Sequence, residues 1–186
     1  MELMPALEIG WLNGWIPLGM LVLVEGLLLK AFPRKVVARL FDRSGWDKKQ
    51  AAFTLIGKLF SLACLFLIVF TPLKIGTGAF IAGAVLYVLG LAGLVVAIFD
   101  FRNTPVSQPV TRGLYKVSRH PQIVMLFVAF LGMCLAIGSW LALLALLASR
   151  LLQHFGILAE EEACLAHYGE SYRDYMKRVP RYFLFF

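Results

Sequence analysis

Four long apolar stretches constrain this chain more than any other feature of its sequence. They run from Trp11 to Ala31, from Phe53 to Leu73, from Gly78 to Ile98 and from Gln122 to Ala148. A helix of about 20 apolar residues crosses the ~30 Å hydrocarbon core of a bilayer, so each stretch is long enough to span it. Hydrophobic residues make up 60% of the chain and the mean hydropathy is +0.79, which is too apolar for an ordinary water-soluble domain. We therefore predict an all-α integral membrane protein.

The fourth stretch is too long for one comfortable crossing. Gly138 and Ser139 interrupt it, and both residue types favour a turn. We predict a hairpin of two helices here, the second running on past Leu152. The chain then holds about five transmembrane helices and a C-terminal cytoplasmic helix. We expect one domain over residues 1–186, with three spanning helices in 1–100 and the cofactor-binding half in 101–186.

Lysine and arginine residues alternate between the predicted loops. The first loop, the third loop and the C-terminal tail are rich in them, whereas the second loop has only Lys74 and the Gly138 turn has none. Because cytoplasmic loops carry the positive excess, we predict an outside N-terminus and a cytoplasmic C-terminus. The basic residues flank apolar runs and do not follow one polar face, so the net charge of +7 indicates a lipid bilayer as partner and no nucleic acid.

Small residues inside the apolar stretches predict packing, not chemistry. Gly83, Gly90 and Gly93 lie near one helical face and would allow close approach of another helix. Three cysteines are widely spaced and odd in number, which predicts neither a disulfide framework nor a metal site: Cys64, Cys134 and Cys164. No sequence feature indicates an oligomeric state.

A first polar block lies between Asp100 and Gln122. Its second part, from Val110 to Gln122, reads VTRGLYKVSRHPQ and enters the fourth apolar stretch. Pro121 suits the first turn of a helix, where its missing N–H costs nothing. His120 would then lie beside free backbone donors at the positive end of the helix dipole, a place that suits a ligand carboxylate.

A second polar block, from Glu160 to Tyr182, predicts a helix that leaves the membrane. Apolar and aromatic residues recur three or four apart and form one stripe: Leu165, Tyr168, Tyr172 and Tyr175. Extended backwards, this stripe directs Glu161 inward and Glu160 outward. Glu161 and His120 would form a bipolar pocket for a zwitterion. The alternative is that the three glutamates are a solvated face and His120 an interfacial histidine.

The two blocks, VTRGLYKVSRHPQ and EEEACLAHYGESYRDYMKRVP, resemble the isoprenylcysteine carboxyl methyltransferase family and the related phospholipid and thiol methyltransferases. The resemblance covers roughly the C-terminal half. It implies an S-adenosylmethionine-dependent methyltransferase that acts on a lipophilic or small acceptor: an isoprenylcysteine-like carboxyl, a thiol or a lipid amine.

The resemblance also implies roles for particular residues. The cofactor contacts would be Tyr115, His120, Pro121, Gln122 and Ile123, with Ser107, Gln108, Pro109 and Val110 lining the site, Glu161 at the polar end and Asp100 as a further contact. At position 157 the family often has an arginine that serves the substrate. Apart from the resemblance, Arg119 is expected either to orient an anionic substrate or to contact a lipid phosphate or the backbone. Two positions depart from the family pattern, because Ile123 stands where a tyrosine is usual and Ile157 where an arginine is often found.

Transfer of a methyl group from a sulfonium needs little acid–base machinery, so we assign no catalytic base. The expected step is in-line displacement by a nucleophile that enters from the bilayer. Two alternatives remain at this stage. One is an NADPH-dependent sterol or enone reductase-like membrane enzyme, although the inward Glu161 would repel a polyanionic cofactor. The other is a non-enzymatic membrane scaffold.

Overall fold

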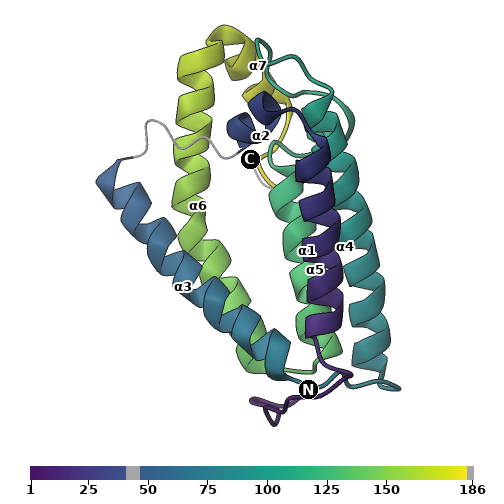
Figure 1. Ribbon diagram of the computed structural model, residues 1–186. Helices are drawn as coiled ribbons and strands as arrows, with labels where there is room; N and C mark the ends of the chain where they lie inside the picture. The colour runs from purple at the N-terminus through teal and green to yellow at the C-terminus, as the bar shows by residue number, and fades with distance from the viewer. Residues whose placement is uncertain (41–46, 184–186) are drawn as a thin grey trace.

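The computed structural model describes residues 1–40 and 47–183, and these residues fold into helices connected by short loops (Figure 1). The described residues contain seven α-helices and one short 3₁₀ helix. In chain order they are α1 (Trp15–Ala31), α2 (Arg34–Leu40), α3 (Lys48–Phe70), α4 (Gly78–Arg102), η1 (Gly113–Lys116), α5 (Pro121–Ala136), α6 (Trp140–Tyr168) and α7 (Glu170–Arg178).

The predicted helical membrane fold is confirmed. Three helices, α3, α4 and α6, are long and apolar enough to cross a membrane, and α1 and α5 are apolar helices of 17 and 16 residues. The predicted break in the fourth stretch is also present. Gly138 has a positive φ of 67°, and the Ser139 side chain accepts a hydrogen bond from the Ala142 N–H to start α6.

Three local features differ from the sequence prediction. The short helix α2 forms within the predicted first loop, in which Arg43 lies outside the described residues. Helix α3 starts before its apolar stretch because Asp47 and Gln50 form a capping box. The predicted C-terminal helix is divided at Gly169, whose φ of 58° ends α6 and turns the chain into α7.

The loops rich in lysine and arginine gather at one end of the bundle, as their alternation predicts (Figure 1). At this end Arg39 of α2 donates hydrogen bonds to the Gln108 carbonyl and the Tyr168 hydroxyl, both at 2.9 Å. At the opposite end Lys74 forms an ion pair with Glu2 at 3.1 Å. We call the first of these the basic end.

Glycines join α4 and α5 closely, which confirms the packing prediction for Gly83, Gly90 and Gly93. A Cβ atom built on Gly90 would lie 2.4 Å from the Ala129 nitrogen, and one on Gly83 would lie 2.5 Å from the Gly132 carbonyl oxygen. At Gly93 the neighbour is the side chain of Met125 on α5. The absence of side chains therefore lets the two backbones touch.

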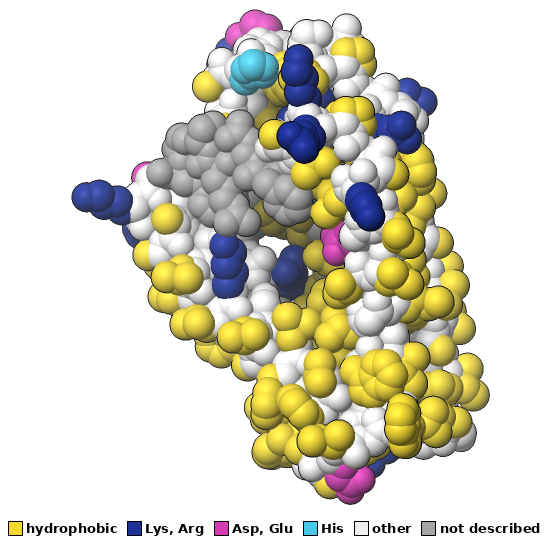
Figure 2. Space-filling model, viewed as in Figure 1, with side chains coloured by type: hydrophobic (Ala, Val, Ile, Leu, Met, Phe, Trp, Pro, Cys, Tyr) yellow, Lys and Arg dark blue, Asp and Glu magenta, His cyan; other side chains and the backbone are white. Residues whose placement is uncertain are grey.

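Helix α6 pairs with α3 and contacts α5 little. The Ser61 hydroxyl lies 2.6 Å from the Ser149 hydroxyl, and the Gln153 amide donates to both. Helices α5 and α6 diverge from the Gly138 turn toward the basic end (Figure 1). The space-filling view shows a hollow between the α3 side and the α1 side, with basic side chains at its edge (Figure 2). We call the space between α5 and α6 the wedge.

Candidate functional site

The start of α5 is tied to the C-terminal segment at the basic end. His120 precedes the helix and Pro121 occupies its first position. The Arg119 N–H donates to the Pro180 carbonyl at 2.9 Å, and the Ser118 hydroxyl donates to the Arg181 carbonyl at 2.8 Å. This pairing brings the two sequence blocks together through residues that lie about 60 positions apart in the sequence.

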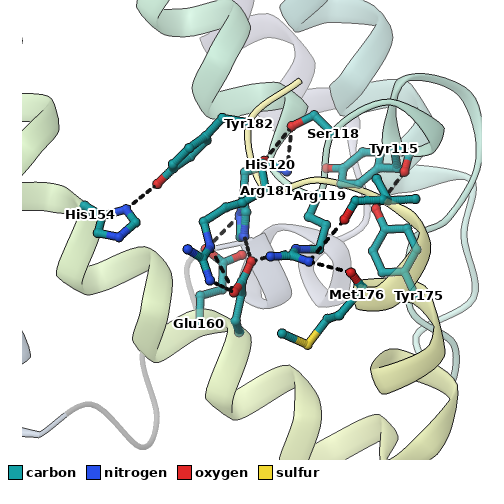
Figure 3. A network of polar contacts seen from close by, with 12 residues as sticks. Tyr115, Ser118, Arg119, His120, His154, Glu160, Tyr175, Met176, Arg181 and Tyr182 are labelled. Carbon is teal, nitrogen blue, oxygen red and sulfur yellow. Dashed lines mark hydrogen bonds and ion pairs between the residues drawn. The ribbon is translucent and has the colours of Figure 1, made fainter. Parts of the chain in front are cut away.

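Glu161 lies at the centre of a buried polar network. Figure 3 shows its partners Arg119, His120 and Arg181 close together. Its exposed fraction is 4% and Glu160 is exposed, as helix phase predicts, and Glu162 is exposed as well. The carboxylate accepts hydrogen bonds from Arg119 Nε at 2.9 Å and from Arg181 Nη2 at 2.7 Å. His120 Nε2 lies 3.2 Å from the same carboxylate. We call Glu161, Arg119, His120 and Arg181 the Glu161 network.

The network differs in one respect from the predicted bipolar pocket. The predicted carboxylate faces a cavity, whereas here two guanidinium groups neutralise it and His120 contacts it directly. Sequence reasoning missed Arg181, because no periodicity connects a residue beyond α7 with one on α6. The hydrogen bond to Glu161 raises the pKa of Arg181 above its ordinary value.

Arg119, predicted to serve the substrate, is buried between three elements. Besides Glu161, its guanidinium donates to the carbonyls of Met176 at 2.9 Å and Val179 at 3.1 Å. It therefore holds the start of α5, the end of α7 and α6 together. Ile157, the other predicted substrate residue, is buried on α6 one turn below Glu161. Substrate contact by either residue stays a prediction.

Tyr182 and His154 extend the polar groups along α6 away from the basic end. Tyr182 Oη lies 2.8 Å from His154 Nδ1, as Figure 3 shows. Burial and the charge of Glu161 raise the pKa of Tyr182 to about 12, against the opposing effect of Arg181 and Arg150. The signal for His154 was in the sequence, because it precedes Glu161 by seven residues and so shares its helical face.

Asp100 and Tyr115, both predicted cofactor contacts, hold the 3₁₀ helix in place. Asp100 Oδ2 accepts from the Leu114 N–H at 3.1 Å. Gly113 has a φ of 53°, and a Cβ there would lie 1.9 Å from Asp100 Oδ2, so glycine is required. The carbonyl of Tyr115 accepts from the Tyr175 hydroxyl at 2.7 Å. Burial raises the pKa of the Tyr115 phenol well above its ordinary value.

The predicted lining segment, residues 107–110, lies at the basic end beside α2. Ser107 and Gln108 are exposed, Pro109 is half-buried and Val110 is buried. Arg39 donates a hydrogen bond to the Gln108 carbonyl of this segment, and the Tyr168 hydroxyl donates to the carbonyl of Val106 just before it. The structure thus joins Arg119 and His120 to Glu161 directly and places 107–110 on a neighbouring loop.

The start of α5 has unused hydrogen-bond donors. The Gln122 side-chain nitrogen is buried and has no partner among the described residues. No side chain in the described part of the chain caps the helix, since its N-cap residue His120 makes no capping hydrogen bond. Pro121 is buried and Ile123 is half-buried beside these donors. A ligand with an anionic group beside an apolar body would accept hydrogen bonds from these donors and pack against Pro121 and Ile123.

Comparison with known proteins assigns the chain to a family. The sequence profile of the phospholipid methyltransferase family matches residues 65–171, more than half of the chain. The chain belongs to the phospholipid methyltransferase family. This family member is also 36% identical over 74 residues to a protein-S-isoprenylcysteine O-methyltransferase of Schizosaccharomyces pombe. The match covers 38% of the chain and 30% of that relative's length. No solved structure matches this phospholipid methyltransferase family member significantly.

Proposed function

We propose that this integral membrane protein is an S-adenosylmethionine-dependent methyltransferase that acts on a lipophilic or small acceptor. The observation that supports it most is the Glu161 network. A buried carboxylate, an imidazole and the uncapped start of α5 converge at one place. Arg119, His120 and Glu161 all lie within the segment that matches the family.

The residues present fit the zwitterionic end of S-adenosylmethionine. Glu161 would bind its ammonium group in exchange for Arg181, the more accessible of its two arginine partners, with a side chain 19% exposed against 4% for Arg119. Arg181, the Gln122 amide and the free N–H groups of α5 would bind its carboxylate. Pro109, Val110, Tyr115, Ile123 and Asp100 are proposed as the surrounding contacts, with Ser107 and Gln108 at the exposed edge.

When bound, the cofactor supplies an electrophilic methyl group on a sulfonium. The chain's own contribution is to hold the acceptor in line with that methyl group and to exclude water. With a carboxylate or thiolate acceptor, opposite charges disappear in the transition state, so a water-poor wedge favours the reaction. The acceptor classes that we propose are an isoprenylcysteine-like carboxyl, a thiol and a lipid amine.

We propose that the basic end faces the cytoplasm and that the N-terminus lies outside. The concentration of lysine and arginine at that end supports this orientation. A polar cofactor would then reach the Glu161 network from the cytosol, while a lipophilic acceptor enters from the bilayer.

Family membership favours methyl transfer over the reductase and scaffold alternatives. Repulsion of a polyanionic cofactor by Glu161 is a weaker reason, because Arg119 and Arg181 neutralise that carboxylate.

Binding of S-adenosylmethionine to the detergent-purified protein, measured by calorimetry, tests the proposal. Glu161→Gln keeps the side-chain size and removes the charge that would bind the ammonium, so we expect affinity to fall about tenfold or more. Glu162→Gln is the matched control, since Glu162 is the exposed neighbour on the same helix. Thermal unfolding verifies that each variant is folded. Unchanged affinity in Glu161→Gln and in His120→Ala would contradict the assigned site.

A further inference from the structure

Helix α6 carries a stripe of four residues on the face that meets the start of α5 and the C-terminal segment. Arg150, His154, Ile157 and Glu161 are spaced four, three and four apart, so they lie within about 60° of one another around the helix. Most residues that contact α3 lie on other faces of the helix: Ser149 and Leu152 contact Gly57, and Phe155 stacks on Phe53 with ring centroids 4.4 Å apart. Gln153 also contacts Gly57 and lies beside the stripe, next to Arg150.

The upper part of this stripe is already partnered across the wedge. Glu161 meets Arg119 and His120 from the start of α5, and His154 meets Tyr182 from the C-terminal segment. The stripe therefore faces the side on which the cofactor site is proposed. Arg150 continues it eleven residues before Glu161, which is about 16 Å along the helix axis.

Arg150 is a cation without a carboxylate partner within 4.0 Å among the described residues. Its Nη2 donates to the Gln153 side-chain oxygen at 3.1 Å, which directs the guanidinium toward the basic end. Its Nε is buried and has no acceptor in the part of the chain that the structure describes. At least one strong donor is thus held in place and left unused.

An unpaired charge inside a membrane-spanning helix is expensive. Such residues face the bundle interior and mark ligand or ion pathways. On the same helix the charge of Glu161 is neutralised by two guanidinium groups. Arg150 has no opposite charge beside it within the described chain, so a bound anion would supply that charge.

We propose that Arg150 binds the anionic group, a carboxylate or a phosphate, of the lipophilic methyl acceptor within the wedge between α5 and α6. This inference rests on the proposed function. A guanidinium offers parallel N–H donors that match either oxyanion, and Gln153 holds one of its nitrogens in a fixed position. Between Arg150 and Glu161 the stripe presents His154 and the apolar Ile157, so the acceptor's anion would lie deeper in the membrane than the cofactor's polar end.

Binding measurements on the full-length protein in detergent test the proposal with three probes. N-acetyl-S-farnesylcysteine carries a carboxylate, lysophosphatidylethanolamine carries a phosphate, and the amide of N-acetyl-S-farnesylcysteine is neutral. We expect Arg150→Gln to weaken binding of at least one anionic probe by about tenfold to a hundredfold and to leave the neutral amide unaffected. Arg150→Lys should retain part of the affinity, because it keeps the charge and loses the fork of donors.

Lys58→Gln is the matched control, because it removes an exposed cation from the spanning helix α3. Loss of carboxylate binding alone or of phosphate binding alone supports the proposal and identifies the source of the anion. The proposal is overturned if the parent protein binds neither anionic probe more tightly than the amide, or if folded Arg150→Gln or Arg150→Lys binds them as the parent does. S-adenosylmethionine affinity is measured in the same samples. Absence of cofactor binding by the parent would reject the proposed function, whereas normal cofactor binding without any dependence on Arg150 would reject only this inference.

Discussion

Helix α5 packs closely against α4 but diverges from α6. Against α4 it presents Gly132 and Ala129 to Gly83 and Gly90, and the backbones touch. Toward α6 it diverges from the Gly138 turn, and among the described residues charged groups at the basic end connect the two helices again (Figure 1). The backbone contact with α4 leaves no space for a ligand, whereas the diverging pair carries polar groups beside the hollow of Figure 2.

The difference shows how one small bundle separates stability from function. Small-residue contacts give tight packing between helices in lipid, where the hydrophobic effect does not hold helices together. Charged groups in the same environment are costly unless they are paired. They are placed where the wedge and the C-terminal segment supply partners, as Glu161 illustrates with Arg119 and Arg181.

The largest expected effect comes from breaking the tight interface. Gly90→Leu places a side chain where even a Cβ would lie 2.4 Å from the Ala129 nitrogen. We expect it to lower the free energy of unfolding by about 3 kcal/mol or more, because two backbones must separate. Titration with SDS in mixed micelles measures the change. Gly19→Leu is the control, since a Cβ at Gly19 meets nothing within 4 Å. Equal stability of the two variants would show that α4 and α5 are not in backbone contact.

A smaller effect is expected at the basic end of the wedge, where Arg119 joins the start of α5 to α6 and α7. Arg119→Met removes hydrogen bonds to Glu161 and to the carbonyls of Met176 and Val179. The expected loss is about 2 kcal/mol in the free energy of unfolding, together with faster proteolysis of the segment after α6. Arg173→Met tests the specificity of this loss, because Arg173 forms an exposed ion pair with Glu170 and such pairs contribute little. If both variants behave alike, Arg119 does not join α5 to the C-terminal segment.

The smallest effect is expected in the polar contact between α3 and α6. Ser61 and Ser149 form a hydrogen bond at 2.6 Å beside Gln153. A double-mutant cycle with Ser61→Ala and Ser149→Ala should give a coupling energy of about 0.6 kcal/mol, which is typical of hydrogen bonds between membrane helices. Strict additivity of the two substitutions would mean that the two hydroxyl groups do not interact.

Much of the fold could be predicted from the length of the apolar stretches and from a few residues that start or end helices. Gly138 and Ser139 placed the hairpin turn, and the glycines of α4 placed its tight face. Helix phase directed Glu161 inward, and His120 and Pro121 marked the start of α5. Other features escaped prediction for physical reasons. The break at Gly169 depends on a positive φ that a single glycine permits but does not require. Arg181 and Tyr182 reach the site only because the chain turns back after α7.

By itself, the sequence determined that this chain is a helical membrane protein and which residues face inward, because these properties depend on local apolar length and helical period. Only the tertiary structure decided that Glu161 is shared by two arginines and that Arg150 lacks a carboxylate partner in the described chain. Both facts depend on contacts between segments that are distant in the sequence. The angle between α5 and α6 and the path of the C-terminal segment determine these contacts, and the spacing of residues along one helix encodes neither.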